Sequence, residues 1–230
     1  MTLLAGGRYR QRLEHGLCRL FQDVIWLPDN PSIDARLAGH TDLNVFMPDP
    51  GHIIVAKDLR PHIVNCLTKD KIICLASGKQ GSVYPQDAGL CICTTGEYTI
   101  YNPKTIDPVA IPYLSGTLIR VPQGYTKCSV SVVSDVAIIT SDDAIAKSAA
   151  DAEMDVLRIR PGNIELDGFE YGFIGGASFR IDSHTIAFTG TLGHHPDCRQ
   201  ILAFLRKHGA VPVFLSDDPL FDIGGAVVLP

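Results

Sequence analysis

Three residues of the sequence have the side chains that nucleophilic catalysis by a thiol requires. Cys128 supplies the thiol, which attacks carbon only as the thiolate and therefore needs a neighbouring cation that lowers its pKa. Lys127 is adjacent in sequence, but neighbouring side chains on the strand expected here point to opposite faces, so the task falls to His40. Asp42 stands two residues after His40 and would share its strand face. The alternative interpretation is a buried core thiol and a surface His40–Asp42 pair.

A second cluster, at residues 194–198, has side chains that can ligate zinc. His194 and Cys198 stand at i, i+4 and could share one face of a helix. Pro196 followed by Asp197 is also a usual helix start, because proline suits the first helical position and the helix dipole favours an acidic side chain there. The sequence has no second ligand pair at structural-zinc spacing. We therefore interpret the cluster as a helix start and predict no bound metal.

Composition narrows the class of protein and of partner. Of 230 residues 46% are hydrophobic, and 20 basic against 25 acidic residues give a net charge of −5, with no basic run longer than two. These values argue against partners such as nucleic acid or an anionic membrane. The sequence has no apolar run of membrane-spanning length and no signal-like apolar segment after Met1, so we expect a soluble, cytoplasmic protein. Seven cysteines, an odd number, favour reduced thiols over a disulfide framework.

Short strands and a few helices must position these residues. Leucines at helical spacing predict an amphipathic helix over residues 8–21. Further helices are predicted over 144–151, capped by Asp142 or Asp143, and over 196–208, before Gly209. Short apolar runs bounded by Gly, Pro, Asp and Asn predict strands at 52–56, 71–75, 89–93, 116–120, 128–133, 137–140, 185–188 and 211–215.

These elements repeat in one order. Residues 171–215 have the order strand, strand, helix, strand, and residues 124–160 and 39–75 repeat it. The first strands of these three units are predicted over 173–181, 125–133 and 39–46. A fourth copy, poor in helix, begins at Gly89, and a fifth opening strand is predicted over 221–229. Such regular spacing is typical of a repeat architecture. Because the last strand has no following partner, we expect a closed ring completed by the N-terminal segment. We predict one domain, residues 1–230, with residues 1–23 as an amphipathic helix that docks on the ring.

Two glycine pairs, at 175–176 and 224–225, suit such a ring. Neither pair lies in a GxGxxG or GxxxxGK pattern, so we do not predict a phosphate-binding loop. The sequence also lacks the GxSxG elbow of serine hydrolases. Glycine at the start of an inner strand would instead allow close backbone approach around a narrow axis.

Five ββαβ units around a pseudo-fivefold axis form the α/β propeller of the penteins, the guanidine-modifying enzymes, and short motifs here resemble theirs. The segment Gly39-His-Thr-Asp-Leu-Asn-Val-Phe46 resembles the His-x-Asp motif of arginine deiminases, in which His is the acid/base and Asp binds the guanidinium. The segment Phe173-Ile-Gly-Gly-Ala-Ser resembles the Glu-Gly-Gly-Asp module. Cys128 lies two units after His40, in the chain order of the small dimethylarginine-hydrolase penteins. The sequence is thus similar to the pentein superfamily as a divergent member.

The sequence departs from that pattern in the units that hold carboxylates. Ile174 takes the place of the Glu in the Gly-Gly unit, and Ala177 takes the place of its Asp. In the final unit the carboxylate of Asp222 lies one residue early. A chain order that starts at His-x-Asp also implies a circular permutation of the familiar enzymes.

The resemblance implies a cysteine-dependent hydrolase or transferase that acts on a small cationic guanidine or amidine, with no metal and no organic cofactor. It implies Cys128 as nucleophile, His40 as general acid/base, and Asp42 with Asp222 as the carboxylates that hold the cation. Asn44 and Lys127 are expected beside the substrate. With His40 near, the pKa of the Cys128 thiol should fall below its ordinary value of about 8.5, which would make it the most reactive cysteine.

The missing carboxylates favour a different class of function. A non-catalytic pentein would use the ring as a rigid platform that binds a ligand or a protein. In that case the protein would resemble the eukaryotic ribosome anti-association factor. The presence of His40, Asp42 and Cys128 together favours the enzyme. A homodimer is compatible with either function.

Overall fold

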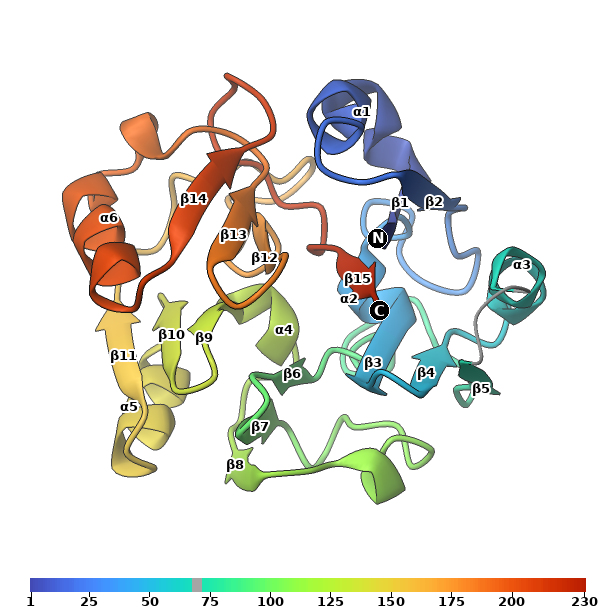
Figure 1. Cartoon of the computed structure of the whole chain (residues 1–230). Coiled ribbons are helices and arrows are strands. Elements are labelled where there is room, and N and C mark those ends of the chain that lie inside the picture. The colour runs from blue at the N-terminus through green and yellow to red at the C-terminus, as the bar shows by residue number, and fades with distance from the viewer. Residues whose placement is uncertain (68–71) are drawn as a thin grey trace.

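The computed structural model describes residues 1–67 and 72–230. These residues form five three-stranded sheets arranged around a common centre (Figure 1). In each sheet the first strand pairs antiparallel with the second, and the second pairs parallel with the third. Parallel neighbours require a crossover connection, which explains the helical segment between each second and third strand. The sheets are β3 (Val45–Asp49), β4 (His52–Val55) and β5 (Ile73–Ala76); β6 (Cys93–Thr94), β7 (Tyr98–Tyr101) and β8 (Thr117–Arg120); β9 (Val130–Ser134), β10 (Ala137–Thr140) and β11 (Asp155–Arg158); β12 (Ser178–Arg180), β13 (Thr185–Phe188) and β14 (Val211–Phe214); and β15 (Val227–Leu229), β1 (Thr2–Gly6) and β2 (Asp23–Leu27).

The predicted ββαβ repeat is therefore confirmed. The crossover helices lie on the outside of the ring (Figure 1); they are α1 (Arg10–Leu17), α3 (Arg60–Cys66), α5 (Asp143–Asp151) and α6 (Cys198–Lys207). The second unit has only a short 3-10 turn at Ile111–Tyr113, as its helix-poor sequence indicated. Of the predicted strand at 71–75, Lys71 lies outside the described residues, and β5 begins at Ile73. Among the described residues, none of the helices combines the length and apolar character needed to cross a bilayer.

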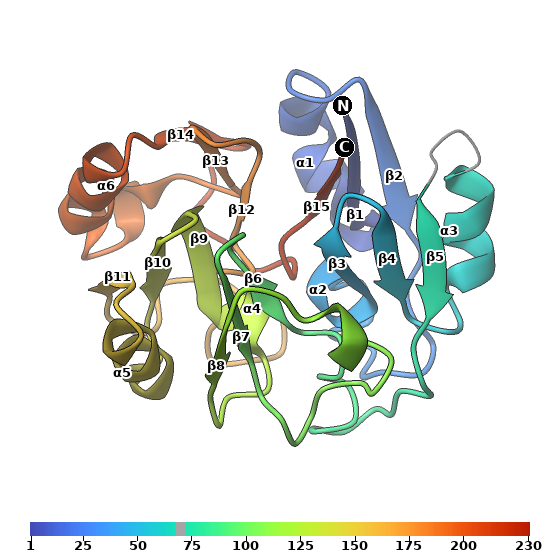
Figure 2. The ribbon, with the colours of Figure 1, turned by 60° about the horizontal axis from the view of Figure 1, so that its bottom comes forward.

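The two ends of the chain close the ring. Thr2 of β1 pairs with Leu229 of β15, and the termini lie side by side (Figure 2). The helix predicted for residues 8–21 is α1, preceded by a 3-10 turn at Gly7–Tyr9. Because α1 connects β1 to β2, it is the crossover helix of the fifth unit, where the sequence had indicated an appended helix.

The predicted inner strands are wrong in their first halves. Residues 39–46 and 125–133 begin with the single helical turns α2 (Thr41–Asn44) and α4 (Thr126–Ser129), and β3 and β9 start only after them. The expected strand over 173–181 likewise opens with a turn before β12, and that over 89–93 contributes only Cys93. The local pattern of apolar residues cannot distinguish a four-residue helical turn from the end of a strand. Contacts with the neighbouring units determine which of the two forms.

The core lies between adjacent units. One cluster joins Ile139 of the third unit to Ile186, Phe188 and Ile201 of the fourth, all fully buried. Each such side chain stabilises the fold by roughly 2 kcal/mol when it leaves water. Ile174 and Ala177, which stand where the resemblance would place carboxylates, both pack in this same cluster.

At the centre, the turns at residues 40–44, 126–129, 173–177 and 222–225 form a hub of backbone hydrogen bonds. The Asp42 amide donates to the Gly224 carbonyl at 3.0 Å, and the Gly225 amide donates to the Gly176 carbonyl at 2.8 Å. The Gly176 amide in turn donates to the Cys128 carbonyl at 2.9 Å. Four of the five units are thus in backbone contact, and the openings of the units converge on one axis as predicted.

The glycine pair 175–176 permits this contact. A Cβ on Gly175 would lie 2.2 Å from the Lys127 carbonyl oxygen and 2.6 Å from that of Cys128. A Cβ on Gly176 would lie 1.8 Å from a carboxylate oxygen of Asp222. The close backbone approach expected of these glycines is confirmed.

Gly175→Ala should therefore destabilise the protein by about 3 kcal/mol or more, because the neighbouring carbonyls belong to backbone that can move only if the hub opens. The free energy of unfolding in urea measures this. Gly193→Ala is the matched control, since nothing lies within 4 Å of its Cβ position. It should change stability by less than about 0.5 kcal/mol. Equal effects of the two substitutions would contradict the hub.

Candidate active site

His40 and Asp42 are carried into the hub by α2. His40 is the residue before the helix, with extended backbone, and Asp42 is its second residue. Their exposed fractions are 1% and 3%. The two side chains come together through this turn and not through the strand face that the sequence indicated. Asn44 holds the turn, because its amide nitrogen donates to the carbonyls of Ala38 and His40 and its oxygen accepts from Asn30.

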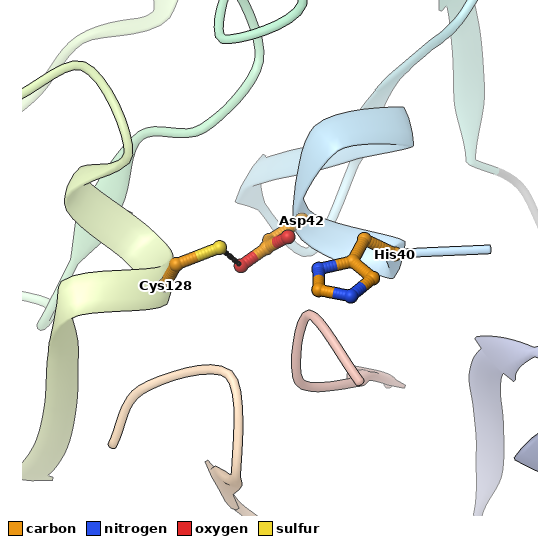
Figure 3. A group of neighbouring side chains, drawn as sticks. All are labelled: His40, Asp42 and Cys128. Atoms are coloured by element: carbon orange, nitrogen blue, oxygen red, sulfur yellow. Dashed lines mark hydrogen bonds between the residues drawn. The ribbon is translucent and has the colours of Figure 1, made fainter. Parts of the chain in front are cut away.

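Cys128 approaches from the facing turn, α4. Its Sγ donates a hydrogen bond to Asp42 Oδ2 at 2.7 Å, and Asp42 lies between Cys128 and His40 (Figure 3). One donor atom of each of the three residues lies within 4.8 Å of the others. Residues 86 positions apart in sequence, from two different units, thus share one site.

Asp222 brings a second carboxylate from the fifth unit. Its Oδ2 accepts from the Phe173 amide at 2.8 Å and its Oδ1 accepts from the Gly224 amide at 2.9 Å. The same Oδ1 lies 3.7 Å from Nδ1 of His40. Asp222 is 2% exposed, so a buried carboxylate faces the imidazole.

A cavity of about 300 Å³ opens over these groups, with His40, Cys128 and Asp222 at its buried end. Its walls are apolar and mostly aromatic: Leu37, Leu43, Tyr125, Leu166, Phe169, Tyr171 and Phe173. Much of this wall comes from the segment 166–173, which sequence reasoning missed. The alternating aromatic residues of that segment were the available signal. The Tyr125 hydroxyl donates to Asp87, which fixes that wall.

Lys127 points elsewhere. Its side chain borders a second cavity, a central channel of about 220 Å³ lined by the first strands of all five units, and Asp42 borders the same channel. Successive side chains diverge by about 100° on a helical turn, so Cys128 can face one cavity while Lys127 faces the other. Lys127 and Asn44, both expected beside the substrate, do not line the cavity that holds Cys128. Lys127 borders the channel, and the side chain of Asn44, at the end of α2, is bonded to Asn30 and to the carbonyls of Ala38 and His40.

Burial dominates the ionisation of the two acid–base groups. It raises the pKa of Asp42 to about 7, with Asp222 adding to the rise and the Cys128 hydrogen bond and Lys127 opposing it. Burial lowers the pKa of His40, against the opposing effect of Asp222. The His40 imidazole is therefore neutral at neutral pH.

The expectation that the pKa of Cys128 is lowered is wrong. A contact with Cys91, burial and the carboxylate of Asp42 all raise the pKa of the Cys128 thiol well above its ordinary value. His40 supplies no cation to offset them, because burial keeps it neutral. Cys128 is thus a protonated thiol at neutral pH. The exposed Cys18 and Cys66 are more accessible to alkylating reagents.

The site has unsatisfied polar atoms. Both ring nitrogens of His40 and Oδ1 of Asp42 are buried without a hydrogen-bond partner in residues 1–67 and 72–230. Buried polar groups are normally paired, so these atoms indicate a ligand that completes the site. The donor set of His40, Asp42 and Cys128 also suits a soft divalent metal such as zinc.

The other candidate zinc cluster forms a helix entry. His194 ends a 3-10 turn at Leu192–His194, and Cys198 is the first residue of α6. Asp197 precedes α6 but makes no capping hydrogen bond; its carboxylate pairs with Arg160 at 2.7 Å. His195 Nδ1 accepts from the Asp197 amide. The side chains of His195 and Asp197 are thus engaged in contacts that shape the start of α6.

Comparisons with known proteins agree with this architecture. Residues 4–227 match the family described as "Family of unknown function (DUF6873)". No curated protein matches the sequence. Among solved structures, a cysteine-to-serine mutant of dimethylarginine dimethylaminohydrolase from Pseudomonas aeruginosa, complexed with citrulline, is 11% identical. The alignment covers 94% of this chain and 91% of that chain, with a TM-score of 0.56.

Two further solved structures have the same fold. A dimethylarginine dimethylaminohydrolase adduct with S-methyl-L-thiocitrulline is 10% identical over 93% of this chain and 92% of that chain, with a TM-score of 0.58. The agmatine deiminase of C. jejuni is 8% identical over 94% of this chain and 75% of that chain, with a TM-score of 0.52. At such low identity the likeness establishes the fold alone, which is the predicted pentein propeller.

The raised pKa of Asp42 has a consequence for stability. The unfolded chain releases this proton near pH 3.8, whereas the folded chain keeps it up to about pH 7. The stability that the raised pKa of Asp42 gives to the folded state is fully present below pH 3.8. It decreases as the pH rises and is lost once the pH passes about 7. Asp42→Asn removes this loss. The stability of the variant relative to the wild type should therefore grow by roughly 3 kcal/mol between pH 5 and pH 8.

Urea unfolding at several pH values measures this difference. Asp217→Asn is the matched control, because Asp217 is exposed, and its effect should not vary over this range. A difference between Asp42→Asn and wild type that stays constant from pH 5 to pH 8 would contradict a raised pKa of Asp42.

Proposed function

The chain belongs to the DUF6873 family and has the pentein fold, and on that premise we propose that it is a cysteine-dependent enzyme acting on a small cationic guanidine or amidine. One observation carries the proposal. Cys128, His40 and Asp222, drawn from three units, lie at the buried end of one cavity, and Asp42 is hydrogen-bonded to Cys128 beside it. Several polar atoms of this group lack partners among the described residues.

The charges of the site support a cationic substrate. Asp42 and Asp222 are carboxylates buried close together, an arrangement that costs free energy unless a positive group neutralises it. A planar guanidinium would offer several N–H groups to their oxygens. Its charge would also lower the pKa of Cys128, so that the thiolate forms only when a substrate is present.

The residues can then divide the chemistry. The thiol proton of Cys128 passes to His40, and Sγ bonds to the guanidinium carbon. The carbon–nitrogen bond to the departing amine breaks as the His40 imidazolium returns that proton to the nitrogen. A thiouronium remains on Cys128. Water gives a proton to His40 and its oxygen bonds to the carbon. The carbon–sulfur bond then breaks, His40 returns the proton to Sγ, and the product loses its hydroxyl proton to solvent and leaves as a urea. In a transferase, an acceptor amine takes the place of water.

Another observation favours a non-catalytic platform. Ile174 and Ala177, which replace the carboxylates of the Gly-Gly unit, are fully buried in the inter-unit core and contribute nothing polar to the cavity. A site with this reduced set could bind a cation without turning it over. Turnover and binding therefore need separate measurement.

Release of ammonia or amine from a panel of guanidines and amidines tests the enzyme. Cys128→Ser should abolish turnover, because its hydroxyl forms a far weaker nucleophile. His40→Gln should lower kcat by at least about 100-fold, the usual contribution of a general acid–base. Cys198→Ser, a half-buried cysteine on α6, is the matched control and should leave turnover unchanged.

Folding of each variant is checked by circular dichroism and thermal unfolding. Turnover that survives in folded Cys128→Ser would contradict Cys128 as the nucleophile and with it the cysteine-dependent mechanism. Binding of guanidines by the wild type without any turnover would favour the platform.

A further inference from the structure

We infer that the cavity selects guanidines or amidines whose remaining part is uncharged or carries a second positive charge, and disfavours those that carry a carboxylate. This inference rests on the proposed function for the guanidinium end. It concerns the other end of the ligand, which must lie along the cavity walls toward solvent.

The charges along the cavity are the first observation. None of the described residues that line it is a lysine or an arginine. Its acidic groups are Asp222 at the buried end and Glu170, which is exposed and therefore lies at the mouth. Between them the walls are apolar and aromatic, with Phe169 and Tyr171 exposed by 39% and 37%. A ligand carboxylate would meet no cation and would face Glu170.

Arg8, Arg12 and Arg36 line a neighbouring pocket that shares Leu166 and Asp222 with the cavity, and all three are already paired. Arg36 forms an ion pair with Asp34 at 2.6 Å and lies over the Phe169 ring at 4.3 Å. Arg12 pairs with Asp218 at 3.1 Å, and Arg8 pairs with Asp29. Lys127 borders the channel on the other side of Asp42. To bind a ligand carboxylate, any of these arginines would have to give up its present ion pair. Lys127 would have to turn its side chain from the channel into the cavity.

The mouth and walls instead suit positive charge. Aromatic faces attract cations, and the Phe169 ring already holds the guanidinium of Arg36. A ligand ammonium near Glu170 would form a solvent-exposed ion pair, which would raise its affinity about fivefold over that of a neutral ligand. A ligand carboxylate in the same place would be repelled, and its affinity would fall by a similar factor.

A matched series of butylguanidines tests this. Butylguanidine, 4-aminobutylguanidine, 4-guanidinobutanamide and 4-guanidinobutanoate differ mainly in the charge of the distal group. We expect kcat/KM to be highest for the amine, intermediate for the two neutral compounds and lowest for the carboxylate. Glu170→Gln should reduce the advantage of the amine over 4-guanidinobutanamide by about fivefold. Asp167→Asn, an exposed residue of the same segment, is the control and should preserve it.

Calorimetric binding of the same four ligands to Cys128→Ser separates this inference from the proposed function. Turnover with the carboxylate preferred to its amide would overturn the inference and leave the enzyme standing. Binding in the predicted order without turnover by the wild type would support the inference and overturn the enzyme. No binding and no turnover of any ligand would overturn both.

Discussion

The backbone contact at the hub is the constraint on which the rest of the structure depends. The turn that carries Cys128 touches the glycine pair 175–176, and that pair touches the carboxylate of Asp222. No side chain fits between them, so the three turns are held at the distance of backbone hydrogen bonds. The convergence of thiol, imidazole and carboxylates follows from this packing. The units themselves are small sheets with apolar interfaces, and the hub fixes how they meet.

The same packing sets the electrostatics of the site. Burial raises the pKa of the Asp42 carboxyl and of the Cys128 thiol and lowers the pKa of the His40 imidazole, with Asp222 buried beside them. Each of these shifts disfavours the charged form of the group. A cation in the cavity would lower the pKa of both Asp42 and Cys128 and so favour their charged forms. Under the proposed function, Cys128 would therefore become reactive only when a cationic ligand binds.

Much of the fold could be predicted from the sequence, because it depends on local patterns that repeat. The spacing of strands and crossover helices indicated five ββαβ units, and the unpaired last strand indicated closure by the N-terminal segment. The resemblance to pentein motifs leads us to expect His40, Asp42 and Cys128 in one site, and the three side chains do lie together, with Cys128 bonded to Asp42. The turns α2 and α4 did not, because hydrogen bonds to other units determine them. The direction of Lys127, the aromatic wall at 166–173 and the raised pKa of Cys128 depend on tertiary packing in the same way.

The most direct test of this account compares two nearly isosteric alkylating agents, 2-chloroacetamidine and 2-chloroacetamide, of which only the first is a cation. Intact mass and peptide mapping give the rate of modification at each cysteine. We predict that the amidine modifies Cys128 faster than the amide by about 100-fold or more, because its charge binds at the buried carboxylates and lowers the pKa of the thiol. The exposed Cys18 should show little preference. Equal rates of the two reagents at Cys128 in the folded protein would contradict the account.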